Sequence, residues 1–249
     1  MIKKISNVST TLIVNLYDSF YYSDDQGIAS CQKQISKKYN SANLLDISRK
    51  ISKTIQTDIL HESSHNFEPF GDSGTLLIQA DLKLYNSATL HLKESHITFH
   101  TYIEDIFDHF AIVRLEYHIS SCSDSNVYDA LKDIILNKNN QNIYPDLVSV
   151  DFIRRGAKYG SNYDDIIYDN NIQCLENFDK YEISSVAQSL NTEHHTFLLK
   201  NDKMIKKFQL EHIFFPLEKI TELRKFLLSS YSDSSIDLSS FEIKSSKNS

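Results

Sequence analysis

Apolar and polar residues alternate along several stretches of the chain, a pattern typical of strands with one buried face. The alternation is clearest at residues 96–102, which read His-Ile-Thr-Phe-His-Thr-Tyr. His96, Thr98, His100 and Tyr102 share one face of this strand, and the other face is mostly apolar. Alternation or short apolar runs predict further strands at residues 10–16, 75–84, 89–92, 111–119, 148–153 and 194–199.

Helical spacing of apolar residues separates the first two of these strands. Residues 28–60 carry this spacing and predict one helix or two, with a break near Asn40–Ser41. A helix is also predicted at about residues 126–136 and an amphipathic helix at 217–228, whereas residues 164–190 stay ambiguous. These elements predict an α+β fold in which an antiparallel sheet carries helices packed on one face.

Two local compositional signals refine this picture. Only five glycines occur in the chain, and two of them, Gly71 and Gly74, bracket Ser73. This clustering predicts a turn that needs backbone freedom. Residues 229–249 are rich in serine and charged residues, so we expect them to form a disordered tail.

The overall composition limits the classes of function. With 249 residues, of which 41% are hydrophobic, the chain can build one large domain or two small ones. The net charge of -7 argues against nucleic acid as a partner and fits, weakly, a cationic substrate. Three widely spaced cysteines argue against a disulfide framework, and Cys31 and Cys174 carry no motif and are interpreted as structural. No apolar run is long enough for a signal peptide or a membrane span, so we expect a soluble, cytoplasmic protein with no membrane partner.

Three segments carry reactive side chains in a fixed order. They are Phe-Glu-Pro-Phe-Gly-Asp-Ser-Gly at residues 67–74, Glu-Ser-His-Ile-Thr-Phe-His-Thr-Tyr at 94–102 and Ser-Ser-Cys at 120–122. In order and spacing they resemble the glycine-serine turn, the self-cleavage site and the Thr-Cys-Gly site of the prokaryotic, pyruvoyl-dependent S-adenosylmethionine decarboxylase proenzymes. Residues 148–156 and 194–199 resemble segments of the longer, enterobacterial-type members, so the resemblance spans about residues 9–215.

The resemblance implies a specific solution to a chemical problem. Decarboxylation of an α-amino acid needs an electron sink that no side chain supplies, and the sequence shows neither a pyridoxal-phosphate lysine motif nor a glycine-rich phosphate cradle. In the family, the hydroxyl at the position of Ser95 attacks the carbonyl at the position of Glu94, and the chain divides between them. Residues 1–94 would become the β chain. Residues 95–249 would become the α chain, whose N-terminal pyruvoyl group, made from Ser95, forms a Schiff base with the substrate. The resemblance thus implies a carboxy-lyase that makes the aminopropyl donor for spermidine synthesis.

The resemblance also implies roles for five other residues. His100 would act as the base in processing, and Ser73 would support the intermediate by hydrogen bonding. Cys122 would protonate the substrate α-carbon, which suits a thiol because its ordinary pKa of about 8.5 keeps it protonated at neutral pH. Glu104 would bind the ribose, and Phe67 would stack on the adenine, with cation–π attraction to the sulfonium as a further contribution.

The same resemblance implies an organisation for the whole chain. Residues 1–145 would form the catalytic α/β unit and residues 146–228 a C-terminal α/β extension, within a sandwich like that of S-adenosylmethionine decarboxylase. Short family members place their sites between paired protomers, which implies a homo-oligomer of α/β heterodimers. Longer members imply a Mg²⁺ requirement, although the sequence shows no ligand set for this ion.

Two other functions stay open. Ile103 and Ser123 stand where the family has proline and glycine, so the substrate could instead be ornithine or arginine. A non-catalytic paralogue that activates a partner subunit is a third hypothesis, against which the presence of Ser95, His100 and Cys122 argues.

Some of the same residues also have simpler interpretations. His96, His100 and His118 could be metal ligands, although no carboxylate stands at a tight ligand spacing. Arg154 and Arg155 could bind an anion, but pairing with the acidic surface is favoured.

Overall fold

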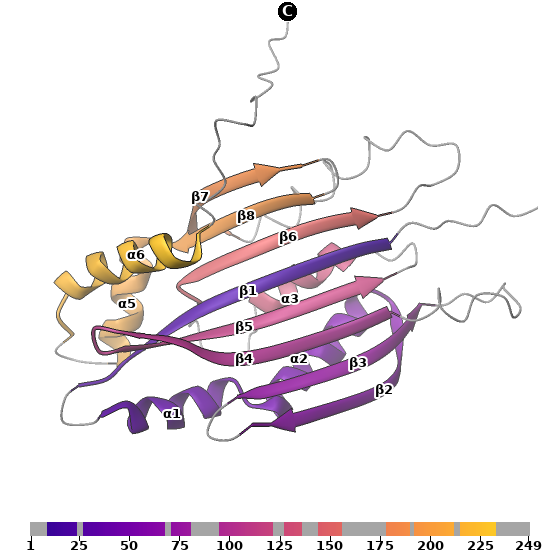
Figure 1. The fold of residues 1–249 in the computed structure, drawn as a ribbon, viewed down its shortest axis with the longest axis horizontal. Coiled ribbons are helices and arrows are strands. Elements are labelled where there is room, and N and C mark those ends of the chain that lie inside the picture. Colours follow the sequence, from indigo (N-terminus) through magenta and orange to yellow (C-terminus); the bar gives the residue numbers. More distant parts are fainter. Residues whose placement is uncertain are drawn as a thin grey trace, which may run out of the picture.

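Eight antiparallel strands form a single sheet in the computed structural model of this chain (Figure 1). The structure describes residues 9–23, 27–67, 71–80, 95–121, 127–135, 144–155, 178–189, 192–211 and 215–232. The strands are β1 Ser9–Tyr21, β2 Thr57–Asn66, β3 Asp72–Ala80, β4 Ser95–Phe107, β5 Phe110–Ser121, β6 Leu147–Arg155, β7 Tyr181–Gln188 and β8 Thr192–Leu199. Their order across the sheet is β2-β3-β4-β5-β1-β6-β8-β7, so the strand nearest the N-terminus lies in the middle.

The helices lie on both sides of this sheet. They are α1 Gly27–Lys38, α2 Ser41–Thr54, the 3₁₀ helix η2 Val127–Ala130, α3 Leu131–Ile135, α5 Asn201–Glu211 and α6 Glu218–Tyr231. Helices α1 to α3 cover one face, which we call the helix face (Figure 1). The ring of Tyr231 in α6 stacks at 4.2 Å on Tyr17, whose side chain alternates to the opposite face. The α+β prediction with an antiparallel sheet is therefore confirmed, and α6 departs from the expectation that the helices pack on one face.

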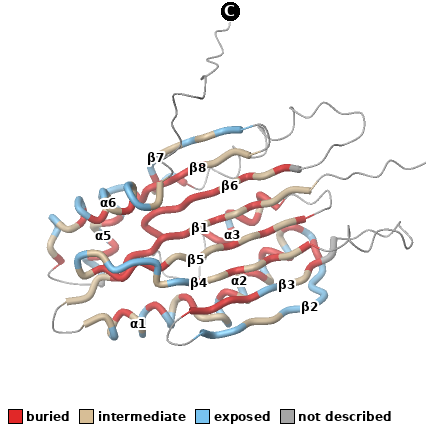
Figure 2. The backbone as a smooth tube through the Cα atoms, in the orientation of Figure 1, coloured by how far each residue is buried: buried red, intermediate tan, exposed pale blue. Residues whose placement is uncertain are grey.

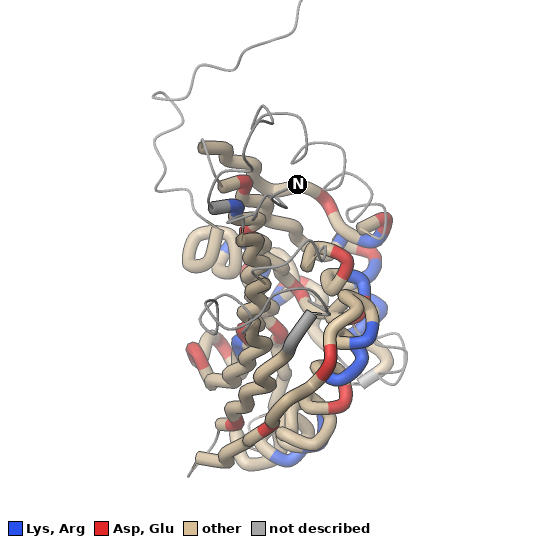
Figure 3. The backbone as a smooth tube through the Cα atoms, turned by 90° about the vertical axis from the view of Figure 1, so that its right-hand side faces the viewer, with Lys and Arg blue, Asp and Glu red and all other residues tan. Residues whose placement is uncertain are grey.

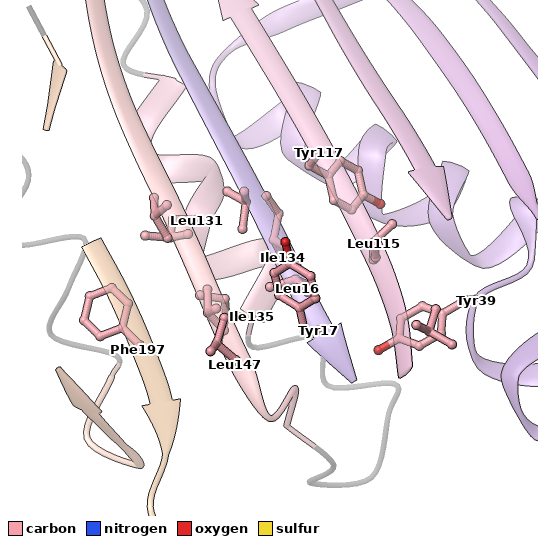
Figure 4. Packing of buried hydrophobic residues seen from close by; sticks show 14 of the residues in the cluster. Leu16, Tyr17, Tyr39, Leu115, Tyr117, Leu131, Ile134, Ile135, Leu147 and Phe197 are labelled. Atoms are coloured by element: carbon pink, nitrogen blue, oxygen red, sulfur yellow. The ribbon is translucent and has the colours of Figure 1, made fainter. Parts of the chain in front are cut away.

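The hydrophobic core lies between the helix face and the helices that cover it. Leu12, Val14 and Leu16 of β1 and alternate residues of β5 are buried there, as the central red strands of Figure 2 show. Figure 4 shows side chains from β1 and β5 packed with those of α3. The hydroxyl of Tyr117 donates a hydrogen bond to the Leu44 carbonyl at 3.1 Å, so α2 is held to β5 by a polar contact inside an apolar layer.

Most strand predictions are confirmed, with β4 beginning at Ser95 and β5 covering the predicted strand at 111–119. The helical region also divides near Asn40 as predicted, and the Asn40 side chain accepts a hydrogen bond from the Asn43 amide as an N-cap. The prediction of helix up to residue 60 is wrong, because β2 begins at Thr57. The predicted helix at 126–136 is a 3₁₀ turn followed by a short α-helix.

The predicted turn around Ser73 is only partly correct. Gly71 has a φ of +136°, which favours glycine, but Gly74 lies inside β3. The predicted tail at 229–249 begins too early, because α6 continues to Tyr231. The predicted strand at 89–92 and residues 233–249 lie outside the described residues.

Gly74 has a packing reason that the sequence did not show. A Cβ atom at this position would lie 2.3 Å from the Phe99 ring, which is fully buried on the adjacent strand. We therefore expect Gly74→Ala to lower the free energy of unfolding by about 1–3 kcal/mol, through overpacking. Urea unfolding would measure this loss, and Thr75→Ala, at an exposed neighbouring position, should change stability by less than about 0.5 kcal/mol. An unchanged Gly74→Ala midpoint would show that the Phe99 ring moves aside at little cost.

The two segments predicted as catalytic unit and C-terminal extension share the sheet. Strand β6 pairs with β1 along nine residue positions, from Ser9↔Arg155 to Tyr17↔Leu147. The division at residues 145 and 146 stays a prediction.

Figure 3 shows the sheet edge-on, with basic and acidic residues interspersed along one side. No side of the chain therefore carries charges of a single sign in this view.

Candidate active site

Ser95 is the first residue of β4 and is almost completely buried, with 3% of its surface exposed. Its side chain alternates with His96 and therefore points to the helix face, as the buried Ile97 and Phe99 do. The Ser95 hydroxyl donates a hydrogen bond to Oγ of Ser121, the last residue of β5, at 3.3 Å. The two serines thus place a pair of buried hydroxyls at one end of the sheet.

His100 lies on the opposite face, which we call the polar face because it carries His96, Thr98, His100 and Tyr102. The strand partner of His100 is Ser73 of β3, so their side chains share this face. Ser73 is 8% exposed, and the His100 ring stacks near Tyr102 with centroids 6.1 Å apart. The structure therefore brings together the two residues predicted to assist processing.

Glu104 is the extra residue of a β-bulge, because the β4–β5 register shifts between Ile103 and Asp105. A bulge re-aims the side chain of the extra residue. The Glu104 carboxylate lies 3.0 Å from Nε of Arg114 on β5, and the Arg114 guanidinium lies 4.8 Å from the Tyr102 ring centre. The predicted ribose ligand is thus already paired with a cation.

Two tyrosines, Tyr17 and Tyr231, lie near Glu104 and Arg114. Burial raises the pKa of Tyr17 although Arg114 opposes the shift, and burial with the nearby carboxylates of Asp105 and Glu104 raises the pKa of Tyr231. Both phenols are therefore protonated at neutral pH and can act as hydrogen-bond donors. Helix α6 in this way brings a C-terminal side chain to the same region of the polar face.

Phe67 follows β2 and keeps 55% of its surface exposed, so its ring is available to a ligand. Its amide donates a hydrogen bond to the Gly71 carbonyl at 2.8 Å, which closes a short turn. A Cβ atom at Gly71 would lie 3.2 Å from the Thr101 carbonyl oxygen and 3.6 Å from the Phe67 ring. Phe67 therefore lies beside Gly71, the residue before β3, and Gly71 lies close to the Thr101 carbonyl of β4.

The structure does not bring all predicted residues together within one chain. Ser95 and His100 are five residues apart on one strand, which corresponds to about 17 Å. An odd separation also places their side chains on opposite faces. Glu94 and Cys122, the other residues predicted at the cleavage site, lie outside the described residues.

The alternative metal site gains no support from the described part of the chain. The rings of His96 and His118 lie 5.0 Å apart, and burial together with the neighbouring His118 lowers the pKa of His96. The described residues contain no group of three or more His, Cys, Asp or Glu side chains that could hold a metal ion.

None of the helices in these residues is long and apolar enough to cross a membrane.

The C-terminal strands carry polar groups that the motifs did not explain. His194 of β8 lies 2.7 Å from an Asp151 carboxylate oxygen on β6 and 3.0 Å from the Thr196 hydroxyl. His195 points to the other face, 2.5 Å from Glu193. Arg154 is 6% exposed, and its expected pairing with acidic side chains stays a prediction.

Sequence reasoning missed Arg114 and Ser121, the two residues that contact the predicted site residues most directly. The β4–β5 hairpin closes through Asp108 and His109, both at positive φ, and its position fixes which β5 residues face β4. Counting back from this turn alone would pair Ser95 with position 122, and only the one-residue shift at the bulge brings Ser95 to Ser121. The pairing of Arg114 with Glu104 depends on the bulge, and no feature of the sequence indicates this bulge.

Comparison with known proteins identifies relatives but no family model that matches the chain. An S-adenosylmethionine decarboxylase proenzyme of Hahella chejuensis is 25% identical over 225 residues, which cover 84% of this chain and 83% of the relative. The protein of the same name from Desulfitobacterium hafniense is 23% identical over 237 residues, with coverage of 86% and 84%. Among solved structures, the adenosylmethionine decarboxylase of Aquifex aeolicus has a TM-score of 0.38 at 16% identity and covers 64% of this chain and 99% of its own. Similarity to the longer, enterobacterial-type form stays a prediction. The similarity to these curated proenzymes over more than four fifths of the chain confirms the resemblance carried by its three motifs.

Proposed function

We propose that this chain is a self-cleaving proenzyme whose mature form decarboxylates S-adenosylmethionine. The observation that carries the proposal is the position of Ser95 in a chain whose relatives are proenzymes. Its hydroxyl is buried at the start of a strand and is oriented by a second hydroxyl. A serine in a solvated turn would have no such orientation. The product would be the aminopropyl donor for spermidine synthesis.

Self-cleavage at Glu94–Ser95 can be written with all atoms conserved. The Ser95 Oγ forms an ester bond to the Glu94 carbonyl carbon as the amide C–N bond breaks, and the hydroxyl proton ends on the freed amine. Loss of the Ser95 α-proton then expels the Glu94 carboxylate and leaves a dehydroalanine, whose hydrolysis consumes water, releases ammonia and leaves the pyruvoyl group. The attack creates an oxyanion, so hydrogen-bond donors near the ester are required.

The surroundings of Ser95 fit a pyruvoyl group. The group replaces a small side chain at a strand terminus, and the Ser121 hydroxyl beside it can donate a hydrogen bond to a carbonyl oxygen. When present, the pyruvoyl group would supply the electron sink that decarboxylation needs. Ser121 would then orient the group, and Cys122 would deliver the proton to the substrate α-carbon.

The groups around Glu104 favour a nucleoside substrate over a free amino acid. Phe67 is exposed and free to stack on a base, and Tyr102 is 38% exposed on the same part of the sheet. Glu104 can accept hydrogen bonds from two ribose hydroxyls while Arg114 balances its charge. Ornithine or arginine would leave these aromatic surfaces unused, but either amino acid remains the second candidate substrate.

A complete site requires two copies of the chain. Because Ser95 and His100 lie about 17 Å apart on opposite faces of one strand, His100 of one copy would have to serve Ser95 of another. We therefore propose a homo-oligomer in which each site combines the Ser95 end of one sheet with the His100 region of its partner. We also propose that the protein is cytoplasmic and that it requires Mg²⁺. Neither proposal assigns a further residue to the site.

Intact-mass measurement of the expressed chain tests self-cleavage directly. We expect two polypeptides, residues 1–94 and 95–249, with a mass at the new N-terminus that corresponds to pyruvoyl instead of serine. A single full-length mass after long incubation would support the non-catalytic paralogue instead. Carbon dioxide release should then be measured with S-adenosylmethionine, ornithine and arginine in separate reactions. Release from ornithine or arginine alone would contradict the nucleoside assignment.

A further inference from the structure

A row of hydroxyl side chains crosses three strands at the end of the sheet where Ser95 lies. Ser95 of β4 donates a hydrogen bond to Ser121 of β5, and Ser121 lies opposite Thr10 of β1. All three side chains share the helix face, where Ile97 and Ile119 are fully buried. Thr10 Oγ1 is buried and has no hydrogen-bond partner among the described residues. Buried hydroxyls next to apolar side chains are costly unless they bond one another or an ordered water molecule.

The direction of the hydrogen bond matters for chemistry. Ser95 is the donor and Ser121 Oγ is the acceptor, at 3.3 Å. A hydroxyl that donates its proton to Ser121 directs its lone pairs away from that serine, and attack on a carbonyl carbon uses such a lone pair. His100 cannot set this orientation within the same chain, because it lies on the polar face.

We propose that Ser121 is a positioning residue for self-cleavage, which holds the Ser95 hydroxyl in the orientation that attacks the Glu94 carbonyl. This inference rests on the proposed function, because it assigns Ser121 to the first step of that reaction. Ser121 undergoes no covalent change: it accepts the Ser95 hydrogen bond as the C–O bond forms, and the proton ends on the freed Ser95 amine.

Three variants test the proposal on the full-length chain. Ser121→Ala should slow appearance of the two fragments by about 10- to 100-fold, because loss of orientation at a reacting atom costs rate of this order. Ser121→Thr keeps the hydroxyl and should restore most of the rate. Ser120→Ala is the matched control, since Ser120 is the adjacent residue and its hydroxyl bonds Thr11 at 3.0 Å on the other face of the sheet. It should cleave at the wild-type rate.

Hydroxylamine separates positioning from a general structural defect. This reagent cleaves an accumulated ester, so it should add little cleavage to Ser121→Ala if ester formation itself is slow. Circular dichroism and thermal unfolding should show that both alanine variants are folded. If wild-type protein cleaves and Ser121→Ala cleaves equally fast, or if hydroxylamine releases its fragments at once, the positioning role is refuted. If wild-type protein does not cleave at all, the proposed function fails instead.

Discussion

Co-expression of a Ser95→Ala chain with a His100→Ala chain should produce cleavage of the His100→Ala chain alone. Each variant by itself should stay full length, because one lacks the nucleophile and the other the base. In a mixed pair, the intact Ser95 belongs to the His100→Ala chain and the intact His100 to its partner. One complete site is therefore formed, and it cuts only the chain that retains Ser95.

The expected extent of cleavage follows from random pairing. Half of the His100→Ala chains would meet a Ser95→Ala partner, so about half of them should be cut when the two chains are expressed equally. Intact mass distinguishes the chains, and different affinity tags show that mixed oligomers form. If the His100→Ala chain is cleaved when it is expressed alone, His100 is not required for processing. Mixed oligomers without any cleavage would show that the two residues do not meet between copies.

The strands that the sequence predicted well are those with an apolar face turned to the core. Every second residue is buried from Ser95 to Thr101 in β4 and from Val113 to Ser121 in β5, so the period of two is visible in the sequence itself. The edge strand β2 was missed because only its first residue, Thr57, is buried, and its hydrophobic residues Ile59 and Leu60 are exposed. Edge strands of this kind form by pairing of the backbone, which leaves little trace in the residue pattern.

Helix α5 was missed for a related reason. Its buried residues include a lysine, Lys207, between Met204 and Phe208, whereas the hydrophobic Leu210 is 74% exposed. A buried lysine cannot be told from a surface lysine until its partners are known. Here those partners, Asp18 and Asp146, come from segments far away in the sequence.

The candidate site shows the same limit. The sequence placed His100 correctly on a strand, whereas Ser73 was expected in a turn and lies in β3. The period of a strand already required Ser95 and His100 to point apart. The bulge at Glu104 and the ion pair with Arg114 depend on how two strands pair, which a local pattern does not specify. Local chemistry was therefore predictable, whereas the partners of each side chain were not.

Replacement of Lys207 by methionine should give the largest loss of stability in the described part of the chain, about 3–5 kcal/mol. Its ammonium lies 2.6 Å from an Asp18 carboxylate oxygen and 2.7 Å from one of Asp146, and all three side chains are at most 5% exposed. Lys38 and the Tyr39 hydroxyl bind the other Asp18 oxygen, at 2.5 and 2.7 Å. Without Lys207, two buried carboxylates would share a single remaining cation.

The pH dependence of the stability loss should show that it is caused by the two buried carboxylates. Burial alone would raise the pKa of Asp18, but the ammonium groups of Lys207 and Lys38 lower it from 3.8 to about 2. Its contribution to wild-type stability is therefore complete above pH 4 and is lost as the pH falls through 2. In Lys207→Met the carboxylate pair should bind a proton more readily in the folded than in the unfolded state, so the deficit should shrink from pH 7 to pH 4.

Urea unfolding at both pH values measures the effect, and Lys203→Met on the same helix is the control. The Lys203 side chain is 43% exposed and pairs with the exposed Asp202, so its loss should leave the urea midpoint nearly unchanged at either pH. The loss of unfolding free energy in Lys207→Met could instead be equal at pH 7 and pH 4. In that case it results from lost packing of the lysine side chain and not from unpaired charge. Because Lys207 joins α5 to β1 and to the residue before β6, a confirmed deficit would also mean that residues 146–228 fold together with the N-terminal strand and not as a separate unit.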